Sequence, residues 1–286
     1  MKIPKILYET VVTGCMLPDV LKVEFRGETH EIECICMDDF GSSDMATRLK
    51  ARSQFSLSMI DTGYPVMFLS IQTRMKLHFC GIDPVFLEDD WQMKPSSLIA
   101  YGWNDVILNP DMIVMPFGGI KASPLVPDEF FIRPDSGDKR FPGQVSSKAD
   151  HNLFRETYKL TPDVPCIVAS PKRVWRETRV WLDMTDTRKV RNDVGSAIMG
   201  MCGYAHDGEK PDPLPRRDIV DFLEQHQEKF QSGFLPDVYV ADFCATQGLV
   251  KLVEVNSVST SGLYGHTDVI SHVVRCAMSV FNNVDD

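Results

Sequence analysis

Three oxygen-bearing side chains near the end of the chain have a spacing that suits metal binding. Asp242 lies in one apolar, alternating run, Glu254 and Asn256 lie in a second, and a short polar connection with Gly248 separates the runs, as in a β-hairpin. Glu254 and Asn256 are two residues apart and share one strand face, so pairing with the first strand can bring Asp242 beside them. Carboxylate and amide oxygens are ligands for hard cations such as Mg²⁺. The hairpin is therefore predicted to hold a metal and a phosphate; the alternative is that each strand turns polar side chains to solvent.

An earlier element supplies positive charge. Residues 129–132 are a short apolar strand that leads into Arg133, and the loop that follows, 135–143, contains glycine and Lys139. An arginine offers a fixed fork of donors that matches phosphate oxygens, and a small loop can bring backbone N–H groups and Lys139 over them. The Walker A pattern is absent from the sequence, which argues against a P-loop. An ordinary exposed hairpin turn is the alternative for this element.

These two elements, taken in order, resemble the ATP-grasp superfamily. The C-terminal hairpin is similar to its metal-binding hairpin, and residues 129–143 are similar to its phosphate-binding strand and loop. Arg133 stands where the superfamily usually has a lysine, as in a clade frequent in phage and bacterial genomes, and the Ser-Gly-Leu-Tyr segment at 261–264 also resembles that clade. The resemblance implies that ATP and Mg²⁺ bind here, and the implied metal ligands are Asp242, Glu254 and Asn256.

The segment 165–182 supplies further parts through the same resemblance. Two apolar strands flank a linker that Pro171 interrupts, as expected of a hinge between the halves of a nucleotide site. By similarity, Glu177 binds the ribose hydroxyls, and the adenine edge pairs with the linker backbone at Val168, Ala169 and Ser170. Arg179 lies two residues after Glu177, shares its strand face and can reach a phosphate or a substrate carboxylate. Without the resemblance, Glu177 and Arg179 would be interpreted as a solvated pair on an edge strand.

The resemblance implies an α+β ATP-grasp fold in which two α/β lobes clasp a nucleotide, preceded by a smaller α/β domain. A glycine pair at 118–119 and nearby prolines indicate a boundary in this region. The predicted division is an N-terminal α/β domain over 1–108 and an ATP-grasp catalytic domain over 109–286. Apolar patterns predict strands over 21–25, 31–36 and 65–71 and helices over 45–55, 218–230 and 267–281. The parts of 183–217 cannot be assigned from their pattern.

The implied reaction is the ATP-dependent ligation of a carboxylate to an amine through an acyl phosphate, with small-molecule or peptide substrates. Mg²⁺ would neutralise charge on the phosphoryl oxygens together with the catalytic residues Arg133, Lys139 and Arg179. Phosphoryl transfer depends mainly on positioning and charge, so the lack of an obvious nucleophile is no objection. Two alternatives are a nucleotide-binding regulatory module without turnover and an ATP-dependent kinase of the same fold. Candidates for contacting the acceptor, or for a structural turn only, are Ser257, Ser259, Ser261 and Tyr264.

Composition narrows the function classes. The chain of 286 residues has a formal net charge of −10 and a pI near 5.2, which argues against a sequence-independent grip on nucleic acid. No apolar run approaches the roughly 20 residues that cross a bilayer, and no secretory core follows the first residues. A cytoplasmic protein is expected, in the host cytoplasm if a phage encodes it.

Two other kinds of site are disfavoured by spacing. Eight cysteines are scattered without a C-x-x-C pair, and the histidines show no H-x₃-H or H-E-x-x-H spacing, so free thiols are expected and zinc chemistry is not. The triplet Asp61–Gly63 repeats the Asp-Thr-Gly of aspartic proteases, in which two aspartates share a proton. A single copy would need a homodimer to provide the second carboxylate.

Overall fold

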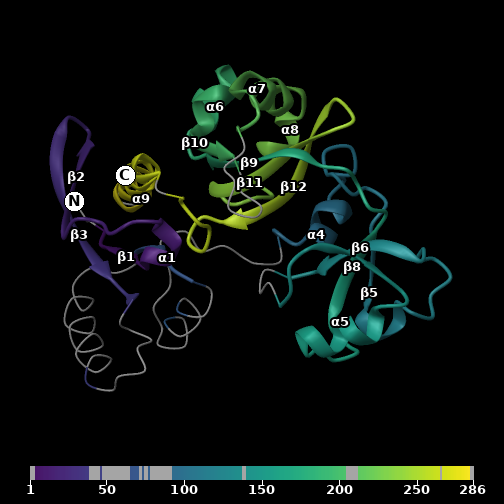
Figure 1. The fold of residues 1–286 in the computed structure, drawn as a ribbon. Coiled ribbons are helices and arrows are strands. Elements are labelled where there is room, and N and C mark those ends of the chain that lie inside the picture. The colour runs from purple at the N-terminus through teal and green to yellow at the C-terminus, as the bar shows by residue number, and fades with distance from the viewer. Residues whose placement is uncertain are drawn as a thin grey trace.

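The computed structural model describes residues 4–38, 46, 65–70, 73, 77, 92–136, 140–203, 212–264 and 266–283. The loop residue Lys139, the triplet Asp61–Gly63 and, except for residue 46, the helix predicted over 45–55 lie outside these residues. The described part contains three four-stranded sheets, with helices between and around them (Figure 1). This combination confirms the α+β class predicted from the sequence.

The first sheet comprises β1 (Ile6–Tyr8), β2 (Val20–Phe25), β3 (Glu28–Cys36) and β4 (Val66–Phe68) in the order β2-β3-β1-β4, and a single helical turn, α1 (Thr10–Thr13), follows β1. Strand β1 is parallel to β3 and β4, whereas β2 and β3 form an antiparallel hairpin. Arg26 and Gly27 close this hairpin with φ angles of 52° and 82°, the left-handed conformation that a two-residue turn requires. The strands predicted over 21–25 and 31–36 are confirmed, and the second begins earlier, at Glu28.

The second sheet comprises β5 (Ile113–Pro116), β6 (Glu129–Pro134), β7 (Gln144–Ser147) and β8 (Pro165–Ala169) in the antiparallel order β5-β8-β6-β7. The short helix α4 (Pro95–Ala100) precedes it, and η2 (Phe117–Gly119) and α5 (His151–Tyr158) lie within its connections. Phe130 and Ile132 of β6 join Phe154 of α5 in one buried cluster. Because side chains alternate along a strand, Arg133 leaves the sheet on the opposite face. We call this sheet with α5 the first lobe.

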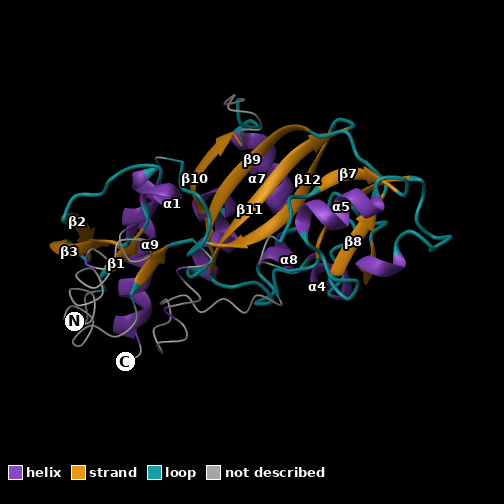
Figure 2. Ribbon diagram, turned by 60° about the horizontal axis from the view of Figure 1, so that its bottom comes forward, coloured by secondary structure: helices purple, strands orange, loops and turns teal. Residues whose placement is uncertain are grey.

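The third sheet comprises β9 (Trp175–Asp183), β10 (Ile198–Gly203), β11 (Val238–Thr246) and β12 (Leu249–Ser257) in the antiparallel order β10-β9-β11-β12. Figure 2 shows its long strands side by side, with β7 and β8 of the first lobe in a separate group. The connections contain α6 (Thr187–Asn192), η3 (Val194–Ala197), α7 (Arg216–Gln225) and α8 (Gln227–Phe230). The segment 183–217 therefore contributes an edge strand and helices that its polar sequence did not indicate. We call this sheet with α6, η3, α7 and α8 the second lobe.

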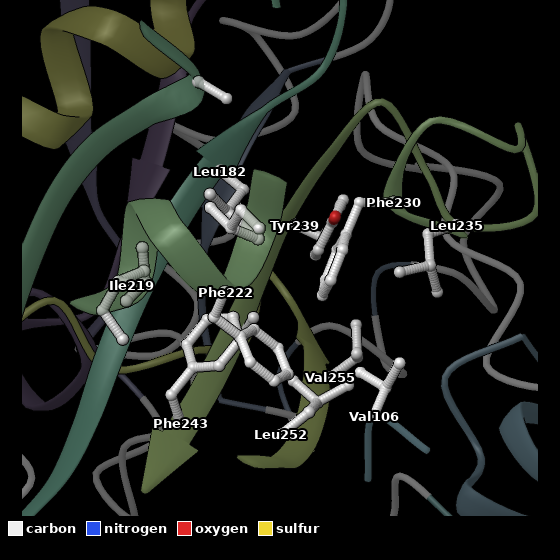
Figure 3. Close-up of a cluster of buried hydrophobic side chains, with 14 of the residues drawn as sticks. Val106, Leu182, Ile219, Phe222, Phe230, Leu235, Tyr239, Phe243, Leu252 and Val255 are labelled. Atoms are coloured by element: carbon white, nitrogen blue, oxygen red, sulfur yellow. The ribbon is translucent and has the colours of Figure 1, made fainter. Parts of the chain in front are cut away.

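Helices α7 and α8 cover one face of the third sheet. Phe222 and Phe230 pack against Phe243 of β11 with ring centroids 5.6 and 6.4 Å apart, within the apolar cluster of Figure 3. The helix predicted over 218–230 is present but is interrupted at His226, whose backbone separates α7 from α8. This packed layer fixes one face of the sheet, whereas the opposite face carries apolar side chains that pack with α9 and, farther along the strands, the polar pair Arg179 and Asp242.

Helix α9 (Thr267–Asn283), predicted over 267–281, lies between the first sheet and the second lobe (Figure 1). Val273 and Val274 share one buried cluster with Ile6 of β1 and with Trp181 of β9. Residues 93–107 pack in turn into the cluster of the second lobe, so apolar packing joins both sides of the boundary predicted at 108/109. Among the described residues, no helix is long and apolar enough to cross a membrane.

The contact between α9 and β10 depends on a glycine. A Cβ atom at Gly200 would lie 2.7 Å from Val269 Cγ2 and 3.5 Å from the ring of Trp181. Overpacking of this kind costs about 1–3 kcal/mol, so we expect Gly200→Ala to lower the free energy of unfolding by that amount in urea denaturation. The matched control is Gly119→Ala, whose new methyl group meets only the flexible end of Met115 at 3.4 Å. Equal stability of the two variants would contradict the close packing of α9 on β10.

Candidate functional site

Three of the side chains predicted to form the site, Arg179, Asp242 and Glu254, lie in one row on the face of the third sheet opposite α7 and α8. Strand register places Cys202 of β10, Arg179 of β9, Asp242 of β11 and Glu254 of β12 opposite one another. Opposed residues of antiparallel strands have Cβ atoms about 4.5–5.5 Å apart, so charged side chains in such a row contact each other. Asn256 follows Glu254 by two residues and shares its face.

A β-bulge at Val253 sets this register. At the tip of the hairpin Phe243 faces Leu252, so an unbroken ladder would place Val253 opposite Asp242. The register instead shifts by one residue, and Glu254 faces Asp242. Because of the extra residue, Leu252 stays in the apolar core while Glu254, two residues farther on, points to the opposite face. The bulge thus allows the acids of both strands to meet.

Arg179 and Asp242 form a buried ion pair. Arg179 Nε donates to Asp242 Oδ1 over 2.9 Å and Nη2 donates to Oδ2 over 2.8 Å. The two side chains are 2% and 0% exposed. The remaining nitrogen, Nη1, donates to the carbonyl oxygen of Gly262 over 3.4 Å, and the guanidinium lies 5.4 Å from the ring centroid of Tyr264. Arg179 is therefore held on all sides by protein groups.

Glu254 joins the second lobe to the first. Arg133 of β6 donates through Nη2 to Glu254 Oε2 over 2.6 Å, with side chains 18% and 15% exposed. The amide nitrogen of Asn256 donates to the other oxygen of Glu254 over 2.8 Å and to Asp242 Oδ2 over 3.2 Å. The carboxylates of Asp242 and Glu254 thus accept hydrogen bonds from the same amide group of Asn256. Their negative charges already favour partial positive charge at this position.

The electrostatics of Asp242 favour an added cation. Burial raises the pKa of Asp242, the guanidinium of Arg179 works in the opposite direction, and the carboxylates of Glu254 and Glu177 raise it further. The net direction is upward, because burial is the largest of these effects and the guanidinium does not fully offset it. A divalent cation beside these carboxylates would offset this cost.

The donor set fits Mg²⁺. Asp242, Glu254 and Asn256 offer only oxygen ligands once the amide of Asn256 turns its oxygen toward the ion, and such ligands suit a hard cation. The structure therefore brings together the three predicted metal ligands with Arg133 and Arg179, while Lys139 lies outside the described residues.

The backbone of the linker predicted to pair with adenine makes hydrogen bonds within the protein. Val168 and Ala169 are buried in β8, and Val168 pairs with β5 on one side and with β6 on the other. The exposed Ser170 donates its backbone N–H to Asp111 over 3.1 Å, and its carbonyl accepts from Lys172 over 3.3 Å. Pairing of an adenine edge with Ser170 would require Asp111 and Lys172 to release these groups. Sequence reasoning overlooked Asp111 and Lys172, which carry no motif.

Glu177 and the serine segment flank the row on opposite sides. Glu177 is half-buried two residues before Arg179, and its charge acts on Asp242, as expected for a shared strand face. Past the hairpin, the hydroxyls of Ser257 and Ser259 lie 2.6 Å apart, and Ser261 donates to the carbonyl of Ser257 over 2.6 Å. These three serines are at most 5% exposed, which favours the structural-turn alternative for them.

Comparisons with known proteins concern the fold alone. No family model matches the chain, and no curated protein matches its sequence. Similar solved structures include a RimK domain ATP-grasp protein from Sphaerobacter thermophilus (11% identity, 65% of this chain and 67% of that chain covered, TM-score 0.45). D-alanyl-alanine synthetase A from Vibrio cholerae has 13% identity, coverage of 72% and 71%, and a TM-score of 0.47. D-alanine–D-alanine ligase from Bacillus anthracis, complexed with ATP, has 11% identity, coverage of 88% and 87%, and a TM-score of 0.49. Likeness at this level assigns neither an activity nor the role of any residue.

Proposed function

We propose that the chain is an ATP-grasp enzyme, a Mg²⁺-dependent ligase that uses ATP to join a carboxylate to an amine through an acyl phosphate. The observation that carries the proposal is the 2.6 Å contact between Arg133 of the first lobe and Glu254 of the second, beside Asp242 and Asn256. Arginines and acids are each common on protein surfaces. Their meeting across two sheets, from positions 121 residues apart in sequence, supports a site for a metal-bound triphosphate.

Arg133 binds the transferred phosphoryl group in this proposal. Its guanidinium now pairs with Glu254, so nucleotide binding exchanges one anionic partner for another and releases Glu254 toward the metal. Mg²⁺, held by Asp242, Glu254 and Asn256, supplies charge neutralisation at the phosphoryl oxygens. No side chain has to act as a nucleophile, because the attacking group belongs to the substrate.

In this proposal Arg179 acts on Asp242 and does not contact a phosphate or a substrate carboxylate itself. Two of its nitrogens are engaged by Asp242, and it is almost fully buried. We therefore assign it as a positioning residue that fixes the orientation of the Asp242 carboxylate. Because this ion pair is buried, the charge of Asp242 is shielded from solvent, and its electrostatic interactions with neighbouring groups are stronger than they would be in water.

The reaction has two steps. A substrate carboxylate oxygen attacks the γ-phosphorus of ATP and ADP leaves, which gives an acyl phosphate. An amine then attacks the acyl carbon, phosphate leaves with the C–O bond electrons, and the amine nitrogen loses a proton to form a neutral amide. Small-molecule or peptide carboxylates and amines are the proposed substrate class.

Nucleotide binding is the first test. A ligand present at one hundred times its Kd stabilises the folded state by about 2.7 kcal/mol, so Mg-ATP is expected to raise the thermal midpoint by several degrees. ATP with EDTA in place of Mg²⁺ is expected to give a smaller rise, because the triphosphate then faces Asp242 and Glu254 without a cation. No shift at millimolar Mg-ATP would argue against a nucleotide site.

The second test separates ligation from other uses of ATP. Incubation with Mg-ATP, candidate carboxylates and hydroxylamine is expected to yield ADP, phosphate and a hydroxamate, because hydroxylamine intercepts an acyl phosphate. A stable phosphorylated product would identify a kinase instead. Binding of Mg-ATP without turnover across a broad panel of carboxylates would favour a regulatory nucleotide-binding module.

A further inference from the structure

A second group of ligand-type side chains lies away from the candidate active site. Asp183, His272 and Cys276 each offer one ligand atom, and these atoms all lie within 4.8 Å of one another. His272 Nε2 is 3.1 Å from Asp183 Oδ2, and Cys276 Sγ is 3.1 Å from the same oxygen. An imidazole and a thiol thus converge on one carboxylate oxygen at the junction of β9 and α9.

The backbone holds these three side chains in position before any ligand arrives. His272 and Cys276 are four residues apart on α9, so they lie on the same helix face, one turn apart. Asp183 is the last residue of β9, and its other oxygen, Oδ1, accepts hydrogen bonds from the Thr185 backbone N–H over 2.9 Å and the Thr185 hydroxyl over 2.5 Å. Thr185 therefore orients Asp183 so that Oδ2 faces the helix, as supporting hydrogen bonds do around metal ligands.

We propose that Asp183, His272 and Cys276 form a binding site for a borderline-soft divalent cation of the Zn²⁺ class. A sulfur, a nitrogen and an oxygen ligand suit such an ion far better than Mg²⁺, which prefers oxygen alone. Three protein ligands leave a fourth position for water or for a neighbouring carboxylate. Asp237 is one candidate, because it directly precedes Val238, which pairs with Asp183 in the β9–β11 ladder.

Metal binding at these residues would replace two protons. Cys276 Sγ and His272 Nε2 each lie 3.1 Å from Asp183 Oδ2, and both donate to it in the metal-free state. A bound cation would take the place of the thiol proton and of the proton on His272 Nε2. The metal-free state instead satisfies Asp183 through those two protons.

One neighbour opposes metal binding. Arg275 Nη2 lies 3.3 Å from His272 Nδ1, which in the metal-free state accepts its hydrogen bond. When Nε2 binds a metal, Nδ1 carries the ring proton and no longer accepts, so the half-buried guanidinium must turn away. The site is therefore expected to bind more tightly when Arg275 is replaced by alanine.

A cation bound by Asp183, His272 and Cys276 would link α9 to the second lobe through its coordination bonds. The helix also packs against the first sheet through its apolar face, so a metal at Asp183 would add a bond to the junction that joins these two units. This role is independent of ligase activity. The H-x₃-C spacing of residues 272–276 is neither of the paired-cysteine and paired-histidine patterns by which zinc sites are recognised in a sequence.

Cobalt is the sharpest probe, because Co²⁺ bound to a thiolate gives a charge-transfer absorption band that an all-oxygen site cannot produce. The full chain, stripped of metal and kept reduced, is titrated with Co²⁺ in the presence of excess Mg²⁺, which occupies the acidic hairpin site. We expect a charge-transfer band that saturates at one equivalent, is displaced by Zn²⁺, and disappears in Cys276→Ser. The matched control is Cys36→Ser at an exposed cysteine, which should retain the band.

Two further variants keep the test decisive if Cys276→Ser fails to fold. His272→Gln, at a side chain 29% exposed, is expected to weaken Co²⁺ binding at least about tenfold. Arg275→Ala is expected to strengthen it. The proposal is overturned if the wild-type chain shows no charge-transfer band, if the band is lost in Cys36→Ser, or if His272→Gln binds Co²⁺ as tightly as the wild type. A rise of the thermal midpoint with Zn²⁺ that is absent in His272→Gln would provide independent support.

Discussion

Replacing Glu254 with glutamine is expected to reduce Mg-ATP turnover at least about a hundredfold while the protein stays folded. The substitution keeps the shape of the side chain and an oxygen for Arg133, but it removes the charge that holds a divalent cation and leaves an N–H₂ group beside Asp242 and Asn256. The measurement is ADP release under saturating Mg-ATP in a coupled assay, with circular dichroism to check the fold.

The choice of Glu254 over Asp242 matters for the interpretation. Asp242→Asn would leave the buried Arg179 without its counter-charge, so a loss of activity could reflect a loss of folded protein. Glu254 is partly exposed, and its partner Arg133 can turn to solvent. Glu156→Gln, the same change on the exposed side of α5, serves as the control and should retain full turnover. Wild-type turnover in Glu254→Gln would refute the metal assignment.

Replacing Arg179 with methionine is expected to destabilise the protein by about 3–5 kcal/mol. The change leaves the fully buried Asp242 carboxylate without its two charged hydrogen bonds, and an uncompensated buried charge is far more costly than a missing surface pair. Urea denaturation of the variant and of the control Arg176→Met measures the difference. Arg176 is an exposed arginine on the same strand, where the loss of a charge should change stability by less than about 0.5 kcal/mol.

A double substitution and a pH series show whether the cost arises from the ion pair. Replacing both partners, as in Arg179→Met with Asp242→Leu, removes the unpaired charge and should recover much of the loss. Burial raises the pKa of Asp242 above its value in the unfolded chain, so the folded state gains stability as the carboxyl group takes up a proton. The loss in Arg179→Met should therefore be greatest at neutral pH and shrink as the pH falls through the folded-state pKa. A loss that does not depend on pH would point to packing rather than to charge.

Local patterns in the sequence were sufficient for much of the fold. Apolar alternation identified the hairpin that carries Asp242 and Glu254, and the glycine-containing connection marked its turn, where Gln247 and Gly248 adopt φ angles of 49° and 79°. Helix α9 was also visible from its periodic apolar face. These features depend on residues close together in the chain.

Features that depend on pairing between distant residues were not visible. Alternation showed that Glu177 and Arg179 share a face, but only the β9–β11 register reveals that Arg179 pairs with Asp242. The edge strand β10 was missed because its sequence, Ile198–Gly203, contains two glycines and follows a polar segment. The meeting of Asp183 with α9 likewise results from packing, which joins residues nearly ninety positions apart.

The bulge in β12 has a consequence for how this strand tolerates changes in length. Between the bulge and the turn, the residues of β12 follow the register in which Leu252 faces Phe243. On the other side of the bulge, they follow the register in which Glu254 faces Asp242. Deleting Val253 would merge the two segments into a regular strand and still leave a glutamate opposite Asp242. Deleting Val255, two residues farther on, would turn Asn256 to the far side of the sheet. A one-residue deletion in this hairpin is therefore expected to preserve the row of site residues at Val253 and to remove Asn256 from it at Val255.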